Sequence, residues 1–358
     1  MTTSTPFALD DIHLIRAYSP DIIKQTWTNN RAEWGPTLDE ETYYAREKVL
    51  ASQEFTSDNK LQVWILVPKT FDSANPQLDL ILSAVETFER PGIVASKDEG
   101  LKDVLSISVA SVFTPAPYRG RGYASLMMRL LWKEIENMKG VSFSFLYSDV
   151  GPTFYGRLGW NPKRSEEIVI PTIHTITGGN TSVEKVTYSN LSDLIAADAE
   201  QVRILLKAQI ETASPSKVFA VVTPEPTCVL WLHARTRFVA QHLVKLDQKV
   251  TELGARQGKS FALWYHDLLK DQLFVIRWYL DPSEGDETAR ALIQAAQEEA
   301  RKWKLSKVVI WNPEQSLANL LKVEIKYRDS AIPSLGLVNS AIETDNVEWV
   351  HNERYSWC

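Results

Sequence analysis

The segment Ser111–Leu131 reads SVFTPAPYRGRGYASLMMRLL, and this stretch decides the fold. Its start closes an apolar run of strand length, Val104–Phe113. Its end opens an amphipathic helix, Tyr123–Met138, in which apolar side chains recur at three- and four-residue steps. In the turn between them, which carries Arg119 and Arg121, successive backbone N–H groups can converge on an anion at a helix N-terminus. The stretch therefore predicts a strand, a pyrophosphate-binding turn and a helix.

Both glycines of this turn fit that interpretation. Gly120 and Gly122 remove side chains that would block a phosphate, while Arg119 and Arg121 supply charge. An ordinary basic surface turn is the alternative for so short a string. The spacing matches neither the phosphate loop that ends in Gly-Lys-Ser/Thr nor the dinucleotide pattern Gly-x-Gly-x-x-Gly, which needs a third glycine. Neither of those two nucleotide-binding folds is supported.

The turn resembles the pyrophosphate loop of the GNAT family of acetyl-CoA-dependent N-acetyltransferases. That loop reads Arg/Gln-x-x-Gly-x-Gly/Ala, matched here by Arg119, Gly122 and Ala124. Downstream, PTFYGRLGW at 152–160 is similar to the family's helix with a Phe-Tyr-x-x-x-Gly-aromatic ending. Together with a β-β-β-loop-α-β-α order, the resemblance covers about residues 10–175.

Across its length the chain is similar to fungal lysine N6-acetyltransferases, which begin lysine catabolism. The matching strings are Glu33-Trp34-Gly35, SVFTPAPYRGRGYA at 111–124, LYSDVGPTFYGRLGW at 146–160 and the terminus NERYSWC at 352–358. All of them lie outside the middle third, 181–258. The resemblance that implies the substrate therefore rests on a smaller part of the chain than the resemblance that implies the reaction type.

The resemblance implies acetyl-CoA as cosubstrate, held by one continuous segment. The cofactor-binding residues implied are Val112, Phe113, Thr114, Arg119, Gly120, Arg121, Gly122, Tyr123 and Ala124. The first three would offer backbone N–H groups to the pantetheine and to the thioester oxygen. Tyr155, by its place in YGRLGW, would protonate the coenzyme A sulfur; a packed aromatic is the alternative.

For the general base the sequence offers no single strong side chain. Some tandem members of the family bring their C-terminal carboxylate into the cleft as the base, and this chain has an aromatic-rich end, Arg354–Cys358. The Cys358 carboxylate is therefore a candidate base, with a merely packed or frayed tail as the alternative. Glu33 and Trp34 are candidates for acceptor binding, because in the family the loop between the first two helices borders the acceptor cleft.

The second half repeats the order of elements in a weaker form. Where the loop would stand it carries Asp281–Asp286, DPSEGD, whose three carboxylates would repel a diphosphate. A linker is expected at Gly178-Gly179-Asn180. We therefore expect an α/β fold of tandem GNAT-like units, with residues 1–180 as the acetyl-CoA-binding catalytic domain and 181–358 as a degenerate GNAT-like domain that closes the acceptor cleft.

Local sequence patterns predict the helices and strands of the first half. Residues Ile12–Leu50 are expected to form two helices with a break at Trp27–Pro36. Strands are expected at Leu61–Val67, Leu78–Val85 and Val104–Phe113, separated by turn-rich stretches such as ERPGIVASKDEG.

Composition limits the partners. Lys and Arg total 39 against 45 Asp and Glu, so the net charge of −6 argues against nucleic acid. Two cysteines, Cys228 and Cys358, are too few for a disulfide framework, and the histidines show no ligand spacing, so no metal site is expected. No apolar run is long enough to span a bilayer, and the start lacks a signal-peptide pattern, so a cytoplasmic protein is expected.

The function expected is direct transfer of acetyl from acetyl-CoA to the side-chain amine of free L-lysine. A protein lysine, a polyamine or an aminoglycoside is the alternative acceptor. A non-catalytic acetyl-CoA sensor is the alternative of another class. An acetylated Cys228 intermediate is less favoured, because this cysteine lacks a glycine-turn context. The oligomeric state is not predicted.

Overall fold

The computed structural model describes residues 7–178, 182–246 and 248–358. The chain forms two compact units that interleave in sequence. Unit 1 comprises Met1–Lys163, Ser216–Ala220 and Pro333–Glu348, and unit 2 comprises Arg164–Pro215, Val221–Ile332 and Trp349–Cys358. The single division near residue 180 stays a prediction, and Gly179 and Asn180 of the expected linker lie outside the described residues.

Unit 1 is built on the larger of two mixed sheets. Its first elements are β1 (Ile12–Ala17), α1 (Pro20–Trp34), α2 (Glu40–Ala51), β2 (Leu61–Pro68), β3 (Ser83–Ser96), β4 (Gly100–Phe113), α3 (Tyr123–Glu136), β5 (Val141–Ser148), α4 (Thr153–Gly156) and β6 (Asn161–Pro162). The later strands β9 (Val218–Val222), β15 (Ile332–Leu337) and β16 (Val347–Trp349) join the same sheet. Its main order is β1-β2-β3-β4-β5-β15-β6, antiparallel from β1 to β4 and parallel between β4 and β5.

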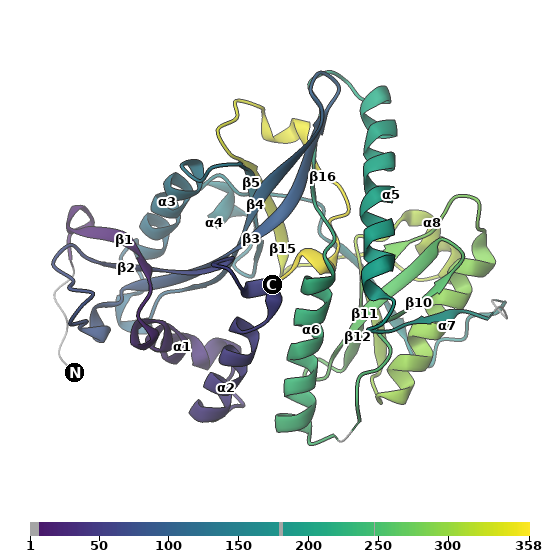
Figure 1. Ribbon diagram of the computed structural model, residues 1–358, viewed down its shortest axis with the longest axis horizontal. Helices are drawn as coiled ribbons and strands as arrows, with labels where there is room; N and C mark the ends of the chain where they lie inside the picture. Colours follow the sequence, from purple (N-terminus) through teal and green to yellow (C-terminus); the bar gives the residue numbers. More distant parts are fainter. Residues whose placement is uncertain (1–6, 179–181, 247) are drawn as a thin grey trace. The chain divides into compact units, whose positions relative to one another are not determined.

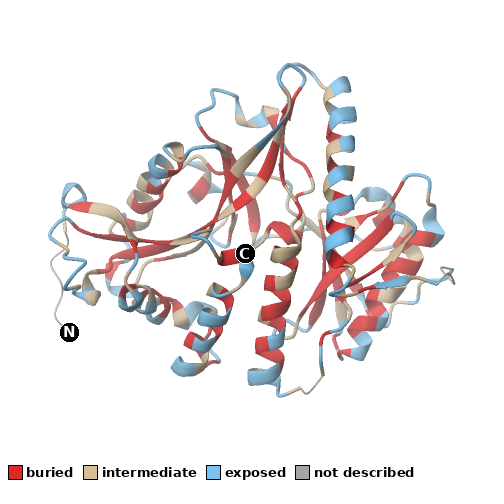
Figure 2. Cartoon of the chain, viewed as in Figure 1, coloured by how far each residue is buried: buried red, intermediate tan, exposed pale blue. Residues whose placement is uncertain are grey.

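The core of unit 1 lies between this sheet and α3. One face of α3 is fully buried through Met127, Met128, Leu131 and Ile135, which pack with strand residues such as Val109. Each such side chain contributes about 1.5–3 kcal/mol when removed from water. The helices α1 and α2 lie on the opposite face of the sheet (Figure 1), and the strands themselves are largely buried (Figure 2). One face of the sheet thus packs with α3 in the main core, and α1 and α2 cover the other face.

Unit 2 repeats the arrangement with a smaller sheet. Its elements are β7 (Glu166–Pro171), β8 (Glu184–Val186), α5 (Leu191–Thr212), α6 (Pro226–Val239), β10 (Gly254–Gln257), β11 (Ser260–Asp267), β12 (Gln272–Tyr279), α7 (Asp286–Lys302), β13 (Lys307–Trp311), α8 (Gln315–Leu321) and β14 (Lys326–Tyr327). The strand order is β14-β7-β13-β12-β11-β10-β8. The parallel pair β12–β13 joined through α7 repeats β4–α3–β5 of unit 1. The predicted α/β class with two related units is confirmed.

The expectation that helix begins at Ile12 is wrong. Residues Ile12–Ala17 form an edge strand, β1, which pairs antiparallel with β2, for example Ile15 with Ile65. The helix starts only at Pro20, a residue suited to the first turn because its missing N–H is not needed there. Sheet pairing with a distant segment therefore overrides the local helical pattern.

The expected break at Trp27–Pro36 is also misplaced. The helix α1 continues through Trp27 to Trp34, and the chain turns at Gly35. A Cβ atom built on Gly35 would lie 2.2 Å from a ring carbon of Tyr43, so the close approach of α2 requires glycine at this turn.

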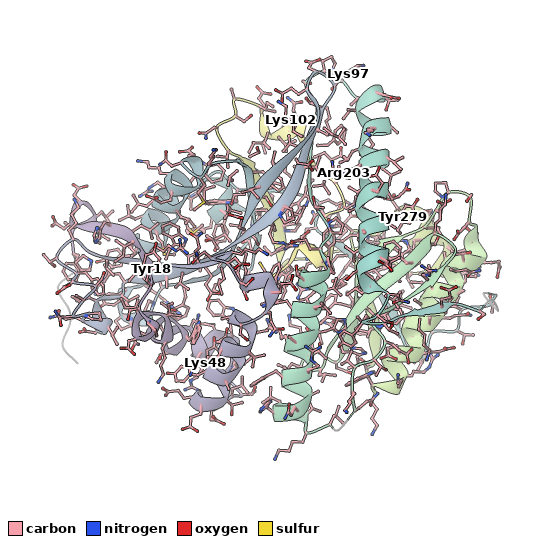
Figure 3. All side chains as sticks on the ribbon, viewed as in Figure 1. Tyr18, Lys48, Lys97, Lys102, Arg203 and Tyr279 are labelled. Atoms are coloured by element: carbon pink, nitrogen blue, oxygen red, sulfur yellow. The ribbon has the colours of Figure 1, made fainter. Side chains whose placement is uncertain are left out.

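The third strand differs in extent from its prediction. Of the expected Leu78–Val85, only the part from Ser83 is strand, and β3 then continues through Pro91 to Ser96. Pairing with β4 along Thr87–Ser96 overrides the local turn signal in ERPGIVASKDEG. The two strands make a long hairpin, with Lys97 and Lys102 near its end (Figure 3).

Candidate functional site

The strands β4 and β5 separate toward their carboxyl ends. Their parallel pairing runs from Leu105 opposite Val141 to Val109 opposite Leu146. Beyond that point β4 continues to Phe113 without a β5 partner, while its other edge stays paired with β3. Backbone groups along such an edge need hydrogen-bond partners. The separation is therefore a place where an extended ligand can bind to the backbone of β4.

A β-bulge lies at this end of β4. The register changes between the pairs Ala84–Phe113 and Glu86–Ala110, so β4 has one residue more than β3 in this stretch. Ser111 adopts φ +53, in the left-handed region that residues other than glycine rarely occupy. Its hydroxyl donates a hydrogen bond to Glu86 Oε2 at 2.7 Å. The bulge changes the direction of the backbone at the predicted thioester-binding residues.

Side-chain contacts fix the residues after the bulge. The Ser83 hydroxyl donates to the carbonyl oxygen of Phe113 at 2.8 Å and lies 2.9 Å from Thr114 Oγ1. Arg119 Nε donates to the carbonyl oxygen of Thr114 at 2.9 Å. Val112 packs against the main core. The end of β4 and the start of the loop thus form one connected structure.

The structure brings the two predicted acceptor-site residues to this loop. Arg119 Nη2 donates to Glu33 Oε1 at 3.2 Å, and both side chains are about half exposed, at 52% and 54%. The ring of Trp34 meets that of Phe113 edge-on, with centroids 5.8 Å apart. An ion pair this exposed contributes about 1 kcal/mol at most. The ion pair therefore adds little stability, but it fixes the position of the end of α1 beside the loop.

The loop itself has the geometry expected of an anion site. Gly120 and Gly122 have φ +74 and +80, a conformation that favours glycine. The N-cap residue of α3, Gly122, makes no side-chain hydrogen bond to the helix, and the first turn holds no acidic residue. The first helical bond, from Leu126 N to Gly122 O, leaves the preceding N–H groups of α3 outside the helical ladder. These N–H groups can bind an anion.

Within the predicted set, the remaining loop residues contribute in different ways. The side chain of Tyr123 is buried, and its hydroxyl bonds with the backbone of Phe7 at 3.1 and 3.3 Å. Tyr123 therefore has only its backbone N–H to offer, as does Ala124. The Arg121 guanidinium lies over the Tyr118 ring at 6.0 Å. Arg119 and Arg121 are the cationic side chains of the loop.

The hydroxyl of Tyr155 is protonated at neutral pH. Tyr155 lies on α4, is buried, and packs edge-on against Phe154 with ring centroids 4.8 Å apart. Burial, and then the charge of Asp149, raise the pKa of the Tyr155 hydroxyl above its ordinary value of about 10. The phenol therefore keeps its proton at neutral pH.

Glu86 is a residue that sequence analysis did not identify. Its side chain is half-buried on the α1–α2 face of the sheet. Burial, followed by the charge of Glu47, raises the pKa of Glu86 to about 7, against the opposing effects of Ser111, Trp27 and Arg46. One local signal existed: this acidic residue interrupts the apolar strand SAVETF at 83–88. The residues that shift the pKa of Glu86 are distant from it in the sequence, so no local pattern reveals them.

The chain end is held within unit 2. Cys228 Sγ donates to the carbonyl oxygen of Tyr355 at 2.9 Å, and the Tyr355 hydroxyl donates to that of Val222 at 2.6 Å. Tyr355 and Ser356 are buried, and Cys358 is half-buried. The tail is thus packed to its last residues. The role of the Cys358 carboxylate as base stays a prediction.

The guanidinium of Arg354 anchors this tail among aromatic rings. It lies 3.9 Å from the ring centroid of Trp357, 4.3 Å from that of Trp311 and 4.8 Å from that of Phe274. Because buried cation–π contacts contribute about 2 kcal/mol or more, we expect Arg354→Ala to lower the free energy of unfolding of the chain by at least that amount. Denaturant unfolding followed by tryptophan fluorescence measures it. A loss no larger than that of Arg301→Ala, on a helix of the same unit, contradicts the anchoring role.

Carboxylates lie just before and in the first turn of the corresponding helix in unit 2. Asp281 Oδ1 accepts hydrogen bonds from the backbone N–H and the hydroxyl of Ser283, and Glu284 Oε1 accepts one from Lys259 N at 2.8 Å. Asp286 lies in the first turn of α7. These carboxylates disfavour a diphosphate at this position.

Two whole-molecule properties complete the description. Across residues 7–178, 182–246 and 248–358, no helix is long and apolar enough to cross a membrane. In the same ranges, no group of three His, Cys, Asp or Glu side chains is arranged to hold a metal ion.

Comparisons with protein families agree with this geometry. The model of the acetyltransferase (GNAT) domain matches residues 99–162, which contain the separated strands and the loop. The model of the LYC1 GNAT-like C-terminal domain matches residues 167–358, more than half of the chain. This chain belongs to the LYC1-like GNAT family. The GNAT resemblance inferred from the loop is confirmed, and the protein is an N-acetyltransferase of GNAT type.

Individual relatives cover nearly the whole LYC1-like chain. A protein named lysine acetyltransferase from Yarrowia lipolytica is 26% identical, over 95% of this chain and 98% of its own. The uncharacterized protein YGR111W of Saccharomyces cerevisiae is 21% identical, over 97% and 98%. Among solved structures, a probable N-acyltransferase from Enterococcus faecalis has a TM-score of 0.57 at 12% identity, covering 91% of this chain and 73% of its own. At that identity, this last likeness shows the fold alone.

Proposed function

We propose that this protein transfers the acetyl group of acetyl-CoA directly to the side-chain amine of free L-lysine. The observation that carries the proposal is the convergence, at the separated end of β4, of a bulged strand, an anion-binding loop and the two residues Glu33 and Trp34. The 26% identity to a named lysine acetyltransferase over 95% of the chain supports lysine as the acceptor. The proposal includes a role in lysine catabolism in the cytoplasm.

The residues present fit acetyl-CoA. Its pyrophosphate would bind to the N–H groups at the start of α3, with Arg119 and Arg121 adding positive charge. A Cβ atom on Gly120 would have no atom within 4 Å, so this residue leaves open space at the loop. The pantetheine amides would pair with the β4 edge at Val112–Thr114, which has no β5 partner.

The chemistry needs a neutral amine, a polarised thioester and a proton for the departing thiolate. The amine nitrogen attacks the thioester carbonyl carbon, the N–C bond forms, and the C–S bond breaks. Backbone N–H groups at the end of β4 would stabilise the oxygen that gains negative charge. Tyr155 would give its proton to the sulfur, which its raised pKa allows because the phenol is protonated at neutral pH.

The base predicted from the sequence is the C-terminal carboxylate of Cys358. If this carboxylate is the base, one glycine appended after Cys358 moves it away and lowers kcat about a hundredfold, while the Kd for acetyl-CoA stays the same. The same glycine added before Met1 is the control. If the extended chain turns over at the normal rate, the terminal carboxylate is not the base and the tail is only packed.

The release of coenzyme A in the presence of different amines tests which amine is the acceptor. The purified protein is offered acetyl-CoA with free L-lysine, its α-acetyl derivative, a lysine peptide, spermidine or an aminoglycoside in parallel. Release with free lysine alone is the expected result and shows that both α-groups are needed. If release is faster with a peptide, spermidine or the aminoglycoside, that compound is the acceptor instead of lysine. Tight acetyl-CoA binding without release in any of the five assays identifies a sensor instead of an enzyme.

A further inference from the structure

The carboxylate of Glu86 lies next to the reacting end of β4 but has no role in the chemistry above. Glu86 is paired in register with Ala110, the last residue before the bulge. Its Oε2 accepts the hydroxyl of Ser111, the residue that forms the bulge. The backbone that would hold the thioester, Val112–Thr114, follows directly. Glu86 is thus one strand away from the proposed position of the acetyl group.

Groups from three other elements face this carboxylate. Ser111 on β4 and Trp27 on α1 donate hydrogen bonds to it, and Glu47 and Arg46 on α2 act through their charges. Of the two charges, that of Glu47 has the larger effect on Glu86. The carboxylates of Glu86 and Glu47 therefore outnumber the cation Arg46 among these groups on the α1–α2 face of the sheet.

Arg46, the cation among the described groups named above, is already engaged. Arg46 Nε and Nη2 both donate to Glu47 Oε1, at 2.8 and 2.5 Å, and Nη1 donates to the carbonyl oxygen of Trp34 at 2.9 Å. The same guanidinium lies over the Tyr43 ring at 4.6 Å. Among residues 7–178, 182–246 and 248–358, no cation forms a close ion pair with Glu86, although a carboxylate removed from water usually has such a partner. An arriving ammonium group would supply it.

We propose that Glu86 binds the side-chain ammonium of the acceptor and takes from it the proton that it must lose before attack. This inference rests on the proposed acetyl transfer. The ammonium nitrogen loses two protons on becoming an amide: one goes to Glu86 and then to solvent, and the other passes through solvent to the Tyr155 phenolate and replaces the proton that Tyr155 gave to the thiolate. No further reactant is needed.

The titration of Glu86 suits this task. A general base works best when its pKa is near the operating pH, and the pKa of Glu86 is raised to about 7. Because the base must be deprotonated, kcat/KM should rise with pH up to about 7 and then level off. An unperturbed glutamate would place this rise near pH 4.3.

The test is Glu86→Gln, which removes the charge but keeps the shape and an acceptor oxygen for Ser111. We expect kcat/KM for lysine to fall about a hundredfold or more and the rise near pH 7 to disappear, with the Kd for acetyl-CoA unchanged. The matched control is Glu89→Gln on the same strand, which should leave both quantities as they are. A normal pH profile in the Glu86→Gln variant overturns the proposal.

Two further measurements separate this role from a structural one. Glu47→Gln removes the charge that raises the pKa of Glu86, so the rise in kcat/KM should move to lower pH. An acceptor whose amine is already neutral at pH 7, such as an aminooxy analogue of lysine, should restore most of the rate of Glu86→Gln. A rise that stays in place in Glu47→Gln, or an equal loss with the neutral amine, contradicts the proposal.

The outcomes also separate this inference from the proposed function and from the terminal carboxylate. A wild-type protein that acetylates no amine refutes the proposed function and this inference with it. An active wild type with an unaffected Glu86→Gln variant refutes only the role of Glu86. If the glycine extension after Cys358 abolishes the pH-dependent rise while Glu86→Gln keeps it, the base is the terminal carboxylate.

Discussion

Replacing Tyr155 by phenylalanine is expected to lower kcat by about a hundredfold or more and to leave the Kd for acetyl-CoA unchanged. The substitution removes only the hydroxyl, and a positioned general acid contributes about 10²–10⁴-fold to such reactions. The ring stays packed against Phe154, so the core of unit 1 is retained. Steady-state kinetics with lysine, together with acetyl-CoA binding by calorimetry, measures both quantities.

The pH dependence gives this prediction a second check. Burial and Asp149 raise the pKa of Tyr155, and an acid works only while it is protonated. Loss of activity through ionisation of Tyr155 should therefore begin above the ordinary tyrosine range, and kcat should hold up to about pH 10. The control is Tyr118→Phe, which removes another buried hydroxyl of unit 1, one that bonds to the carbonyl oxygen of Asp79. Equal losses in kcat for the two variants would identify Tyr155 as a packing residue.

Replacing Gly122 by glutamate is expected to weaken acetyl-CoA binding about a hundredfold or more. The new carboxylate would lie at the start of α3, where the pyrophosphate is proposed to bind, and like charges a few ångströms apart repel by several kcal/mol near a protein surface. Gly122 also has φ +80, so any side chain there adds strain. Calorimetric titration with coenzyme A measures the effect.

A neutral variant separates charge from strain at this position. Gly122→Gln has the same size and the same backbone cost as the glutamate, so the difference in Kd between the two variants is electrostatic. That difference should shrink as salt is raised, because exposed charges are screened. If both variants bind coenzyme A as the wild type does, the loop around Gly122 is not the pyrophosphate site.

Features decided by local sequence could be predicted. The turn at Arg119–Gly122 and the helix after it follow from glycine placement and apolar spacing within one short stretch, and the structure has both. The family resemblance indicated Glu33 and Trp34 as residues bordering the acceptor cleft, and their contacts with Arg119 and Phe113 became visible only in the structure. Whether any of these residues binds substrate stays a prediction.

Features decided by distant pairing could not be predicted. The segment Ile12–Ala17 has a helical pattern but forms a strand because β2, more than forty residues later, offers it a partner. The strand β3 runs through Pro91 for the same reason. Glu86 becomes unusual only when Ser111 and Glu47 are brought to it by the fold. In each case the deciding contact joins residues that no local pattern connects.

The interleaving of the two units has a consequence for how the chain is made. Unit 1 draws strands from Ser216–Ala220 and Pro333–Glu348, close to the end of the chain. During synthesis from the N-terminus, the sheet that carries the loop therefore remains incomplete until residues 333–348 have been made. A fragment cut after residue 180 would expose the edges where β9 and β15 belong, and exposed strand edges promote aggregation. The part of the chain that carries the loop should therefore fold only together with the later strands of unit 1.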